Sequence, residues 1–216
     1  MSAASRALAL LAAAVTSAAF ADEEVGNGRR AGPPTKPAWE FAATGYHTSV
    51  RNGDDYASAI LAADRGPLHL EGRISYEAIG ARSAFVGWTF SGGDALTWEV
   101  TPIVGGAWGT VRAFVPGIEA SVASGRFDFY TEAEYVRDHG DHSANYLYAW
   151  SELGFRPVEW LRAGLVGQRT RAYGVDRDFQ RGPFVQATWR RVTVGGFWFN
   201  PGSSQQVFVL SIGAAF

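Results

Sequence analysis

The segment Asp138-His139-Gly140-Asp141-His142 holds the densest group of residues that could do chemistry, with two imidazoles and two carboxylates close together. Both side-chain types are ordinary ligands of divalent cations. A loop this short, however, rarely aims four ligands at one point. The segment is therefore interpreted as a solvated surface loop, and the sequence predicts neither a metal site nor any other cofactor.

Recognisable motifs for other chemistry are missing from the sequence, which contains no phosphate loop, dinucleotide fingerprint, nucleophile elbow or zinc signature. The formal net charge of −2 gives no basic excess, so no nucleic-acid partner is expected. The length of 216 residues suits a single domain, and the lack of cysteine is compatible with export.

His69 and Glu71 form a second candidate pair for acid–base work, because alternate residues of a strand share one face. Ser75 would lie further along that face. Neighbours of this kind on one strand usually fill space, so no catalytic residue is predicted here.

The elements that must position these residues are β-strands. From Trp39 onward, segments of about ten residues with alternating apolar and polar side chains are separated by turn signals such as Asn52-Gly53. No helical period persists. Twelve candidate strands begin near Trp39, Asp55, Leu68, Ala81, Leu96, Thr110, Gly125, Tyr146, Trp160, Gly182, Val192 and Gln206, with ten or fourteen strands as alternatives.

Two features fit this strand pattern less well. Pro102, Pro116 and Pro183 fall inside proposed strands, and because proline donates no ladder hydrogen bond, each is expected at a bulge or a strand end. The segment Ile79-Gly80-Ala81 is interpreted as a tight turn, although the strand count places a longer loop there.

The N-terminal residues are typical of a secretory signal. Arg6 precedes a short apolar run at residues 7–15, and Ala19-Phe20-Ala21 is a small-x-small cleavage site. We expect a signal peptide at residues 1–21, cleaved after Ala21, and a flexible polar leader at residues 22–38. An uncleaved membrane anchor is the alternative, but the apolar run is short for spanning a bilayer.

The last residues form an alternating strand, in which one face carries Phe208, Leu210, Ile212 and Phe216. This pattern resembles the terminal strand of Gram-negative outer-membrane β-barrel proteins, where a C-terminal aromatic residue with apolar residues at every second position marks the chain for barrel assembly. The resemblance implies an all-β fold, a transmembrane antiparallel β-barrel over residues 39–216 in the bacterial outer membrane. It also implies contact with outer-membrane lipids, the barrel-assembly machinery and periplasmic chaperones.

Aromatic residues sort by strand end when the C-terminus is placed on the periplasmic side. Tryptophans assigned to a girdle are Trp39, Trp98, Trp160 and Trp189 near periplasmic ends and Trp198 near an outer end. Indole rings favour the headgroup level of a bilayer, so two girdles are expected.

The polar face of the strands would then line a lumen. Charged residues predicted to point inward are Glu71, Arg73, Glu77, Glu99, Glu119, Asp128, Glu132, Glu134, Glu152 and Arg162. Charges of both signs in a narrow lumen tend to pair, so a salt-bridged, closed barrel is the default interpretation. The alternative interpretation, which gives the lumen a function, is a polar conduit whose acidic excess favours cations or polyhydroxylated solutes. The sequence thus predicts a structural or small-solute conduit role.

The alternative is an enzyme acting on lipid A or phospholipid. His142-Ser143 is similar to the His and Ser of outer-membrane lipid hydrolases, some of which carry a His-x-Ser-Asn pattern, whereas this sequence has His-Ser-Ala-Asn. In those enzymes the His acts as a base on a nearby Ser. Adjacent residues of a strand face opposite sides, so this spacing argues against catalysis.

Overall fold

The computed structural model describes residues 37–172 and 178–216. The predicted signal peptide at residues 1–21, its cleavage after Ala21 and the leader up to residue 36 lie outside the described residues. Among the residues that are described, no helix is long and apolar enough to cross a membrane.

The described chain folds almost entirely into antiparallel strands joined in sequence order. The strands are β1 (Glu40–Val50), β2 (Tyr56–Arg65), β3 (Leu68–Ile74), β4 (Arg82–Trp88), β5 (Phe90–Gly92), β6 (Thr97–Trp108), β7 (Ala113–Ser124), β8 (Phe127–Asp138), β9 (Tyr146–Val158), β10 (Leu161–Ala172), β11 (Asp178–Trp189), β12 (Val192–Phe199) and β13 (Val207–Ala215). A single turn of 3-10 helix, η1 (His142–Ala144), lies between β8 and β9.

β4 and β5 are two parts of one barrel strand. Both pair with β6 in a single register, in which Gly87 is opposite Ile103 and Phe90 is opposite Val100. Thr89 interrupts them, and its hydroxyl oxygen lies 2.9 Å from that of Thr101 on β6. The barrel therefore has twelve strands, as the sequence predicted, and the alternatives of ten and fourteen are wrong.

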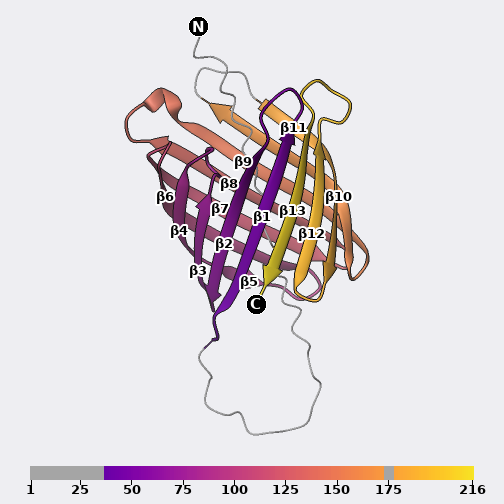
Figure 1. Cartoon of the computed structure of the whole chain (residues 1–216). Coiled ribbons are helices and arrows are strands. Elements are labelled where there is room, and N and C mark those ends of the chain that lie inside the picture. Colours follow the sequence, from indigo (N-terminus) through magenta and orange to yellow (C-terminus); the bar gives the residue numbers. More distant parts are fainter. Residues whose placement is uncertain (1–36, 173–177) are drawn as a thin grey trace, which may run out of the picture.

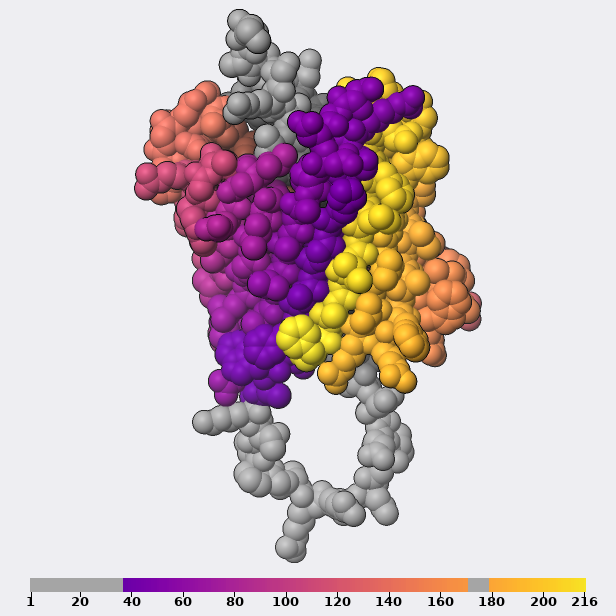
Figure 2. Space-filling view, viewed as in Figure 1, coloured from indigo at the N-terminus to yellow at the C-terminus, as the bar shows by residue number. Residues whose placement is uncertain are grey.

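The barrel closes where its first and last strands meet. β1 pairs with β13, and each other strand pairs with its neighbours in the chain, so the ladder returns on itself. Phe41 and Phe216 exchange two backbone hydrogen bonds of 3.0 and 2.9 Å at this seam. Figures 1 and 2 show β1, in indigo, side by side with β13, in yellow. Among the described residues, closure pairs the first strand with the last and so removes the open edge that would prevent strands from crossing a bilayer.

The three prolines inside the strands coincide with gaps in the ladders. Pro102 lies where the β4–β6 ladder stops and the β5–β6 ladder has not begun. Pro116 lies in a gap of the β7–β8 ladder, and Pro183 directly precedes the first pair of the β11–β12 ladder. Proline has no N–H to donate to a ladder, and at each of these positions the ladder has no hydrogen bond that would need one.

The connection between β3 and β4 corrects one expectation. It spans residues 75–81 and is not a tight turn at residues 79–81. Ser75 takes a positive φ of 54°, and its N–H donates to the Ala81 carbonyl at 2.8 Å. The alternation of faces stops there, so Tyr76, which a period of two residues continued from Ile74 would place outward, folds into the barrel and is 1% exposed.

The outer face of the barrel is apolar. The five girdle tryptophans and the four residues assigned to the terminal-strand signal are all exposed: Trp39, Trp98, Trp160, Trp189 and Trp198, and Phe208, Leu210, Ile212 and Phe216. On the other face of this strand, Val207, Val209 and Ser211 are buried. Soluble monomers rarely expose apolar area on this scale, so this face is suited to contact with lipid.

Candidate functional site

The interior of the barrel contains two groups of ion pairs. The first is the Arg73 cluster, made of Arg73 and the carboxylates Glu71, Glu77, Glu119, Glu132 and Glu134. The second is the Arg162 cluster, made of Arg162, Asp128, Glu152 and Arg156. Every predicted inward charge except Glu99 belongs to one of these two clusters.

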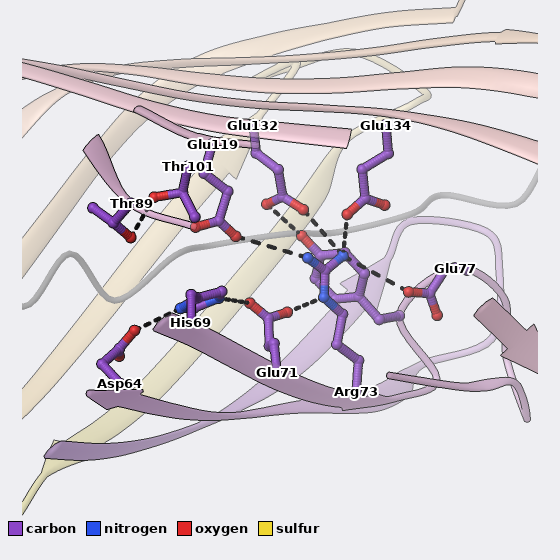
Figure 3. Close-up of polar contacts among 11 residues, drawn as sticks. Asp64, His69, Glu71, Arg73, Glu77, Thr89, Thr101, Glu119, Glu132 and Glu134 are labelled. Atoms are coloured by element: carbon purple, nitrogen blue, oxygen red, sulfur yellow. Dashed lines mark hydrogen bonds and ion pairs between the residues drawn. The ribbon is translucent and has the colours of Figure 1, made fainter. Parts of the chain in front are cut away.

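Arg73 lies at the centre of its cluster with a side chain that is completely buried. Its Nε donates to Glu71, two positions along β3. Its remaining nitrogens face Glu134 at 2.5 Å, Glu132 at 3.1 Å, Glu77 at 3.7 Å and Glu119 at 3.8 Å. Figure 3 shows that these carboxylates reach Arg73 from β7, β8 and the β3–β4 connection. The cluster therefore connects β3 with β7 and β8, which are distant in the sequence, inside the barrel.

Two aromatic rings hold the Arg73 side chain in place. Its guanidinium carbon lies 4.3 Å from the ring centre of Tyr76 and 4.2 Å from that of Phe85. Cations are attracted to the faces of such rings, more strongly when both are desolvated. The Tyr76 hydroxyl in turn donates to Glu132 at 2.8 Å, so ring and carboxylate belong to the same network.

The Arg73 cluster carries an excess of negative charge. Five carboxylates face one guanidinium, and four of the five, together with Arg73, are at most 8% exposed. Removing several like charges from water is costly unless each is neutralised by a cation or by a proton. The cluster can therefore accept further positive charge.

The Arg162 cluster is closer to balance. Arg162, on β10, donates from Nε to Asp128 at 2.8 Å, and it also pairs with Glu152. Arg156 adds a second guanidinium 3.4 Å from Asp128. Arg162 also donates to the Gln186 side-chain oxygen at 2.8 Å. Two cations thus face two carboxylates near the end of the barrel where β8 and β10 begin and β9 ends.

An aromatic cluster fills part of the interior, and the sequence analysis did not predict it. Trp150, Phe197 and Phe199 are all completely buried, with the Trp150 ring centre 5.4 and 5.3 Å from the two phenylalanine rings. Phe184 stacks on Phe197 at 5.6 Å. The available signal was alternation in β12: once Trp198 is assigned outward, Phe197 and Phe199 must point inward.

Two of the predicted charges in these clusters lie nearer to solvent than the other predicted charges there. The side chains of Glu119 and Asp128 are 18% and 15% exposed. Glu99 occupies the same face of β6 as Thr101 but lies near the start of that strand and is exposed. The structure thus brings nine of the ten predicted residues into the two clusters and leaves Glu99 outside them.

His69 lies beside the Arg73 cluster and contacts two carboxylates. Its Nδ1 is 2.7 Å from Asp64, the cross-strand partner of His69 on β2, and its Nε2 is 3.4 Å from Glu71. Among the described residues, His69, Glu71 and Glu119 form the one group whose donor atoms all lie within 4.8 Å of one another, as a shared metal ion would require. Figure 3 shows Asp64, His69 and Glu71 in one row leading to Arg73.

The loop that first suggested metal binding uses its carboxylates to order its own backbone. Asp138 Oδ1 accepts hydrogen bonds from the N–H groups of Gly140 and Asp141 at 2.7 and 2.9 Å. Asp141 Oδ1 accepts from the Ser143 hydroxyl at 2.6 Å and from its N–H at 2.8 Å. These bonds, the hydroxyl first, lower the pKa of Asp141. The interpretation as a surface loop therefore fits its geometry.

No serine is placed as a nucleophile beside a histidine in either candidate pair. The Ser143 hydroxyl donates to Asp141 and not to His142, and both residues are exposed. The Ser75 hydroxyl accepts from the Gly80 N–H at 3.2 Å, while both nitrogens of His69 face carboxylates. The geometry gives no support to the lipid hydrolase alternative.

Comparisons with solved structures identify the architecture. A structure of the KdgM porin matches with a TM-score of 0.59 at 8% sequence identity, over 81% of this chain and 99% of that one. The KdgM porin in complex with disordered oligogalacturonate gives 0.58 at 7% identity, over 81% and 99%. The NanC porin gives 0.55 at 12% identity, over 82% and 98%.

No family model matches the sequence, and no curated protein matches it either. At such low identities the structural likeness establishes the fold alone, because function belongs to sites and not to folds. The class-level resemblance drawn from the terminal strand is confirmed. The chain is therefore a closed, twelve-stranded β-barrel with the fold of the Gram-negative outer-membrane porins.

Proposed function

We propose that this protein is an outer-membrane conduit for small solutes whose lumen is closed at rest. The observation that carries the proposal is a closed barrel with buried ion pairs inside and an apolar face outside. A barrel of this kind can hold a polar path through a bilayer without exposing backbone groups to lipid. The porin-like fold supports the same role.

Closure at rest is supported by the packing of the interior. Trp150, Phe197 and Phe199 pack together in the interior, and the Arg73 cluster beside them joins β3 to β7 and β8. Opening would require side chains in these groups to move apart. Ion pairs and aromatic contacts of this kind are rearranged at a cost of a few kcal/mol each, within reach of ligand binding or voltage.

The charge of the interior favours cationic or polyhydroxylated neutral solutes. Of the ten predicted inward charges, eight are carboxylates and two are arginines. One solved structure with this fold was determined with oligogalacturonate, an acidic sugar oligomer. A lumen with excess carboxylates would repel such an anion, so we expect the solute of this chain to differ in charge.

The remaining parts of the proposal concern where the protein resides and what it meets. We infer a location in the bacterial outer membrane after signal-peptide cleavage. Lipids of that membrane would contact the exposed apolar face, and the barrel-assembly machinery and periplasmic chaperones would act during biogenesis. Exposed tryptophans at both strand ends support the membrane position.

Conductance in planar bilayers tests the proposal. We expect rare openings of the wild-type barrel, with a reversal potential in a salt gradient that indicates preference for cations. The Trp150→Ala variant should open more often, because it removes the largest ring of the aromatic cluster. Trp189→Ala, at an exposed outward position, is the matched control and should behave as wild type.

Absence of conductance at every voltage, both in the wild type and in Trp150→Ala, would leave a purely structural barrel and reject the conduit. A preference for anions would reject the solute class but retain the conduit. The two parts of the proposal are thus tested separately in one recording.

A further inference from the structure

His69 has an arrangement of hydrogen bonds that a neutral imidazole cannot satisfy by itself. Nδ1 lies 2.7 Å from Asp64, a distance at which the ring nitrogen donates its proton to the carboxylate. In the neutral ring Nε2 is then a bare acceptor. Yet Nε2 faces Glu71 Oε2, another acceptor, at 3.4 Å. Two lone pairs at this separation require a positive species between them, either a proton or a metal ion.

The spacing of the donor atoms suits a metal ion. Two ligands bound at about 2.0–2.1 Å to a tetrahedral ion lie about 3.4 Å apart, by the bond lengths of zinc sites. The separation between His69 Nε2 and Glu71 Oε2 is 3.4 Å. Glu119, from β7, brings a third donor atom within 4.8 Å of both, so a small movement of its side chain completes the coordination.

Asp64 stands where metal sites place a positioning residue. Histidines that bind metals usually donate their other ring N–H to a carboxylate, which fixes the ring and its tautomer. Asp64 does this from the position opposite His69 in the β2–β3 ladder. Glu71 is held similarly, since its Oε1 accepts from Arg73 and leaves Oε2 facing His69.

A further buried polar group lies on the same inward face as Glu119. Tyr130 is 4% exposed, and within the part of the chain that the structure describes its hydroxyl makes no hydrogen bond. It lies on the same face as Glu119, since Ser121 is opposite Tyr130 and Glu119 is opposite Glu132 in the β7–β8 ladder. A buried hydroxyl without a partner is costly, and a metal-bound water would satisfy it.

We propose that His69, Glu71 and Glu119 bind a divalent transition-metal ion of the zinc class inside the barrel, with Asp64 as the positioning residue. One imidazole and two carboxylates match the preference of Zn²⁺ and leave a position open for water. The ion also offsets the excess of carboxylates around Arg73. It would link β3 to β7 across the lumen. The proposal concerns binding and stands whether or not the barrel conducts.

Calorimetric titration with Zn²⁺ tests the site, using the purified protein folded in detergent after treatment with a chelator. We expect one ion per barrel, and Co²⁺ in its place should give the visible absorption bands of a low-symmetry site. His69→Gln and Glu119→Gln should each weaken Zn²⁺ binding by more than about tenfold, since each removes a direct ligand. Asp64→Asn should weaken it by about 10- to 100-fold and shift the Co²⁺ bands.

Matched controls separate this site from other ligands in the chain. His47→Gln and the double variant of His139 and His142 to Gln change the three exposed histidines, and Glu159→Gln changes an exposed carboxylate; all should bind Zn²⁺ as the wild type does. Heat-modifiable gel migration verifies that each variant is folded.

Three outcomes would overturn the proposal. The first is a folded wild type that binds no Zn²⁺ at neutral pH, which would mean that protons occupy the space between His69 and Glu71. The second is unchanged binding in folded His69→Gln and Glu119→Gln. The third is tighter binding of Ca²⁺ than of Zn²⁺, which would indicate an all-oxygen site elsewhere.

Discussion

The guanidinium carbon of Arg73 lies 4.2 Å from the centre of the Phe85 ring, one strand away in the barrel wall. On β4, Ser83 is the register partner of Arg73, and Phe85 follows it two positions later. The contact fixes the guanidinium plane while five carboxylates surround it. Arg73 is therefore the residue on which the charge balance of the interior depends most.

Replacing Arg73 should be among the most destabilising single changes in the barrel. Arg73→Met leaves five facing carboxylates without their shared cation, and we expect a loss of about 3–5 kcal/mol in the free energy of unfolding. Arg73→Lys keeps the charge and should lose less, although it cannot keep the same set of directed bonds. Urea unfolding followed by intrinsic fluorescence measures both changes.

The cost of Arg73→Met should depend on pH. Protonated carboxyl groups carry no charge, so lowering the pH relieves the repulsion that the variant creates. Its stability relative to wild type should therefore recover as the pH falls and worsen as it rises. A difference that stays constant between pH 4 and pH 8 would show that lost packing, and not charge, dominates the effect.

The aromatic cluster should contribute stability as well as closure. Phe199→Ala removes a completely buried ring that contacts Trp150 at 5.3 Å between ring centres. We expect a loss of about 3–5 kcal/mol. Phe129→Ala, at an outward and exposed position on β8, should cost much less in detergent. Equal losses in the two variants would contradict the assignment of Phe199 to a packed interior.

Gly182 should tolerate no side chain. A Cβ at this position would lie 1.7 Å from the carbonyl oxygen of Trp198, a backbone atom that cannot rotate away. Gly182→Ala should therefore force a backbone shift and cost about 1–3 kcal/mol. At Gly196 the nearest atom to an added Cβ belongs to Phe208, at 3.6 Å. Gly196→Ala is the control, and its unfolding midpoint should remain near that of the wild type.

Phe216 should matter more for assembly in cells than for stability in detergent. Its ring stacks on Phe41 at 5.9 Å between centres, which is a modest contact at an exposed seam. If the terminal strand carries the assembly signal, Phe216→Ala should lower the amount of folded barrel in the outer membrane while refolding in detergent stays near normal. Heat-modifiable migration in membrane fractions and in refolded protein measures the two effects. Equal defects in both would assign Phe216 a structural role alone.

The sequence by itself determined the strands and their faces. A period of two residues can be read from short segments, and it assigned Phe208, Leu210 and Ile212 to one face of a strand, on which the structure exposes all three side chains. Alternation and turn residues favoured twelve strands and left ten and fourteen open, and the strand ladders decided for twelve. These features are local, because strand geometry sends neighbouring side chains to opposite faces wherever the strand lies in the barrel.

The tertiary structure alone decided which inward side chains meet. Arg73 reaches Glu134 across 61 positions of the chain, and His69 approaches Glu119 from three ladders away. It also turned Tyr76 inward, after β3 had ended and its alternation no longer applied. The physical reason is that contacts across a lumen depend on the closure and stagger of the whole barrel. No short segment of sequence contains that information.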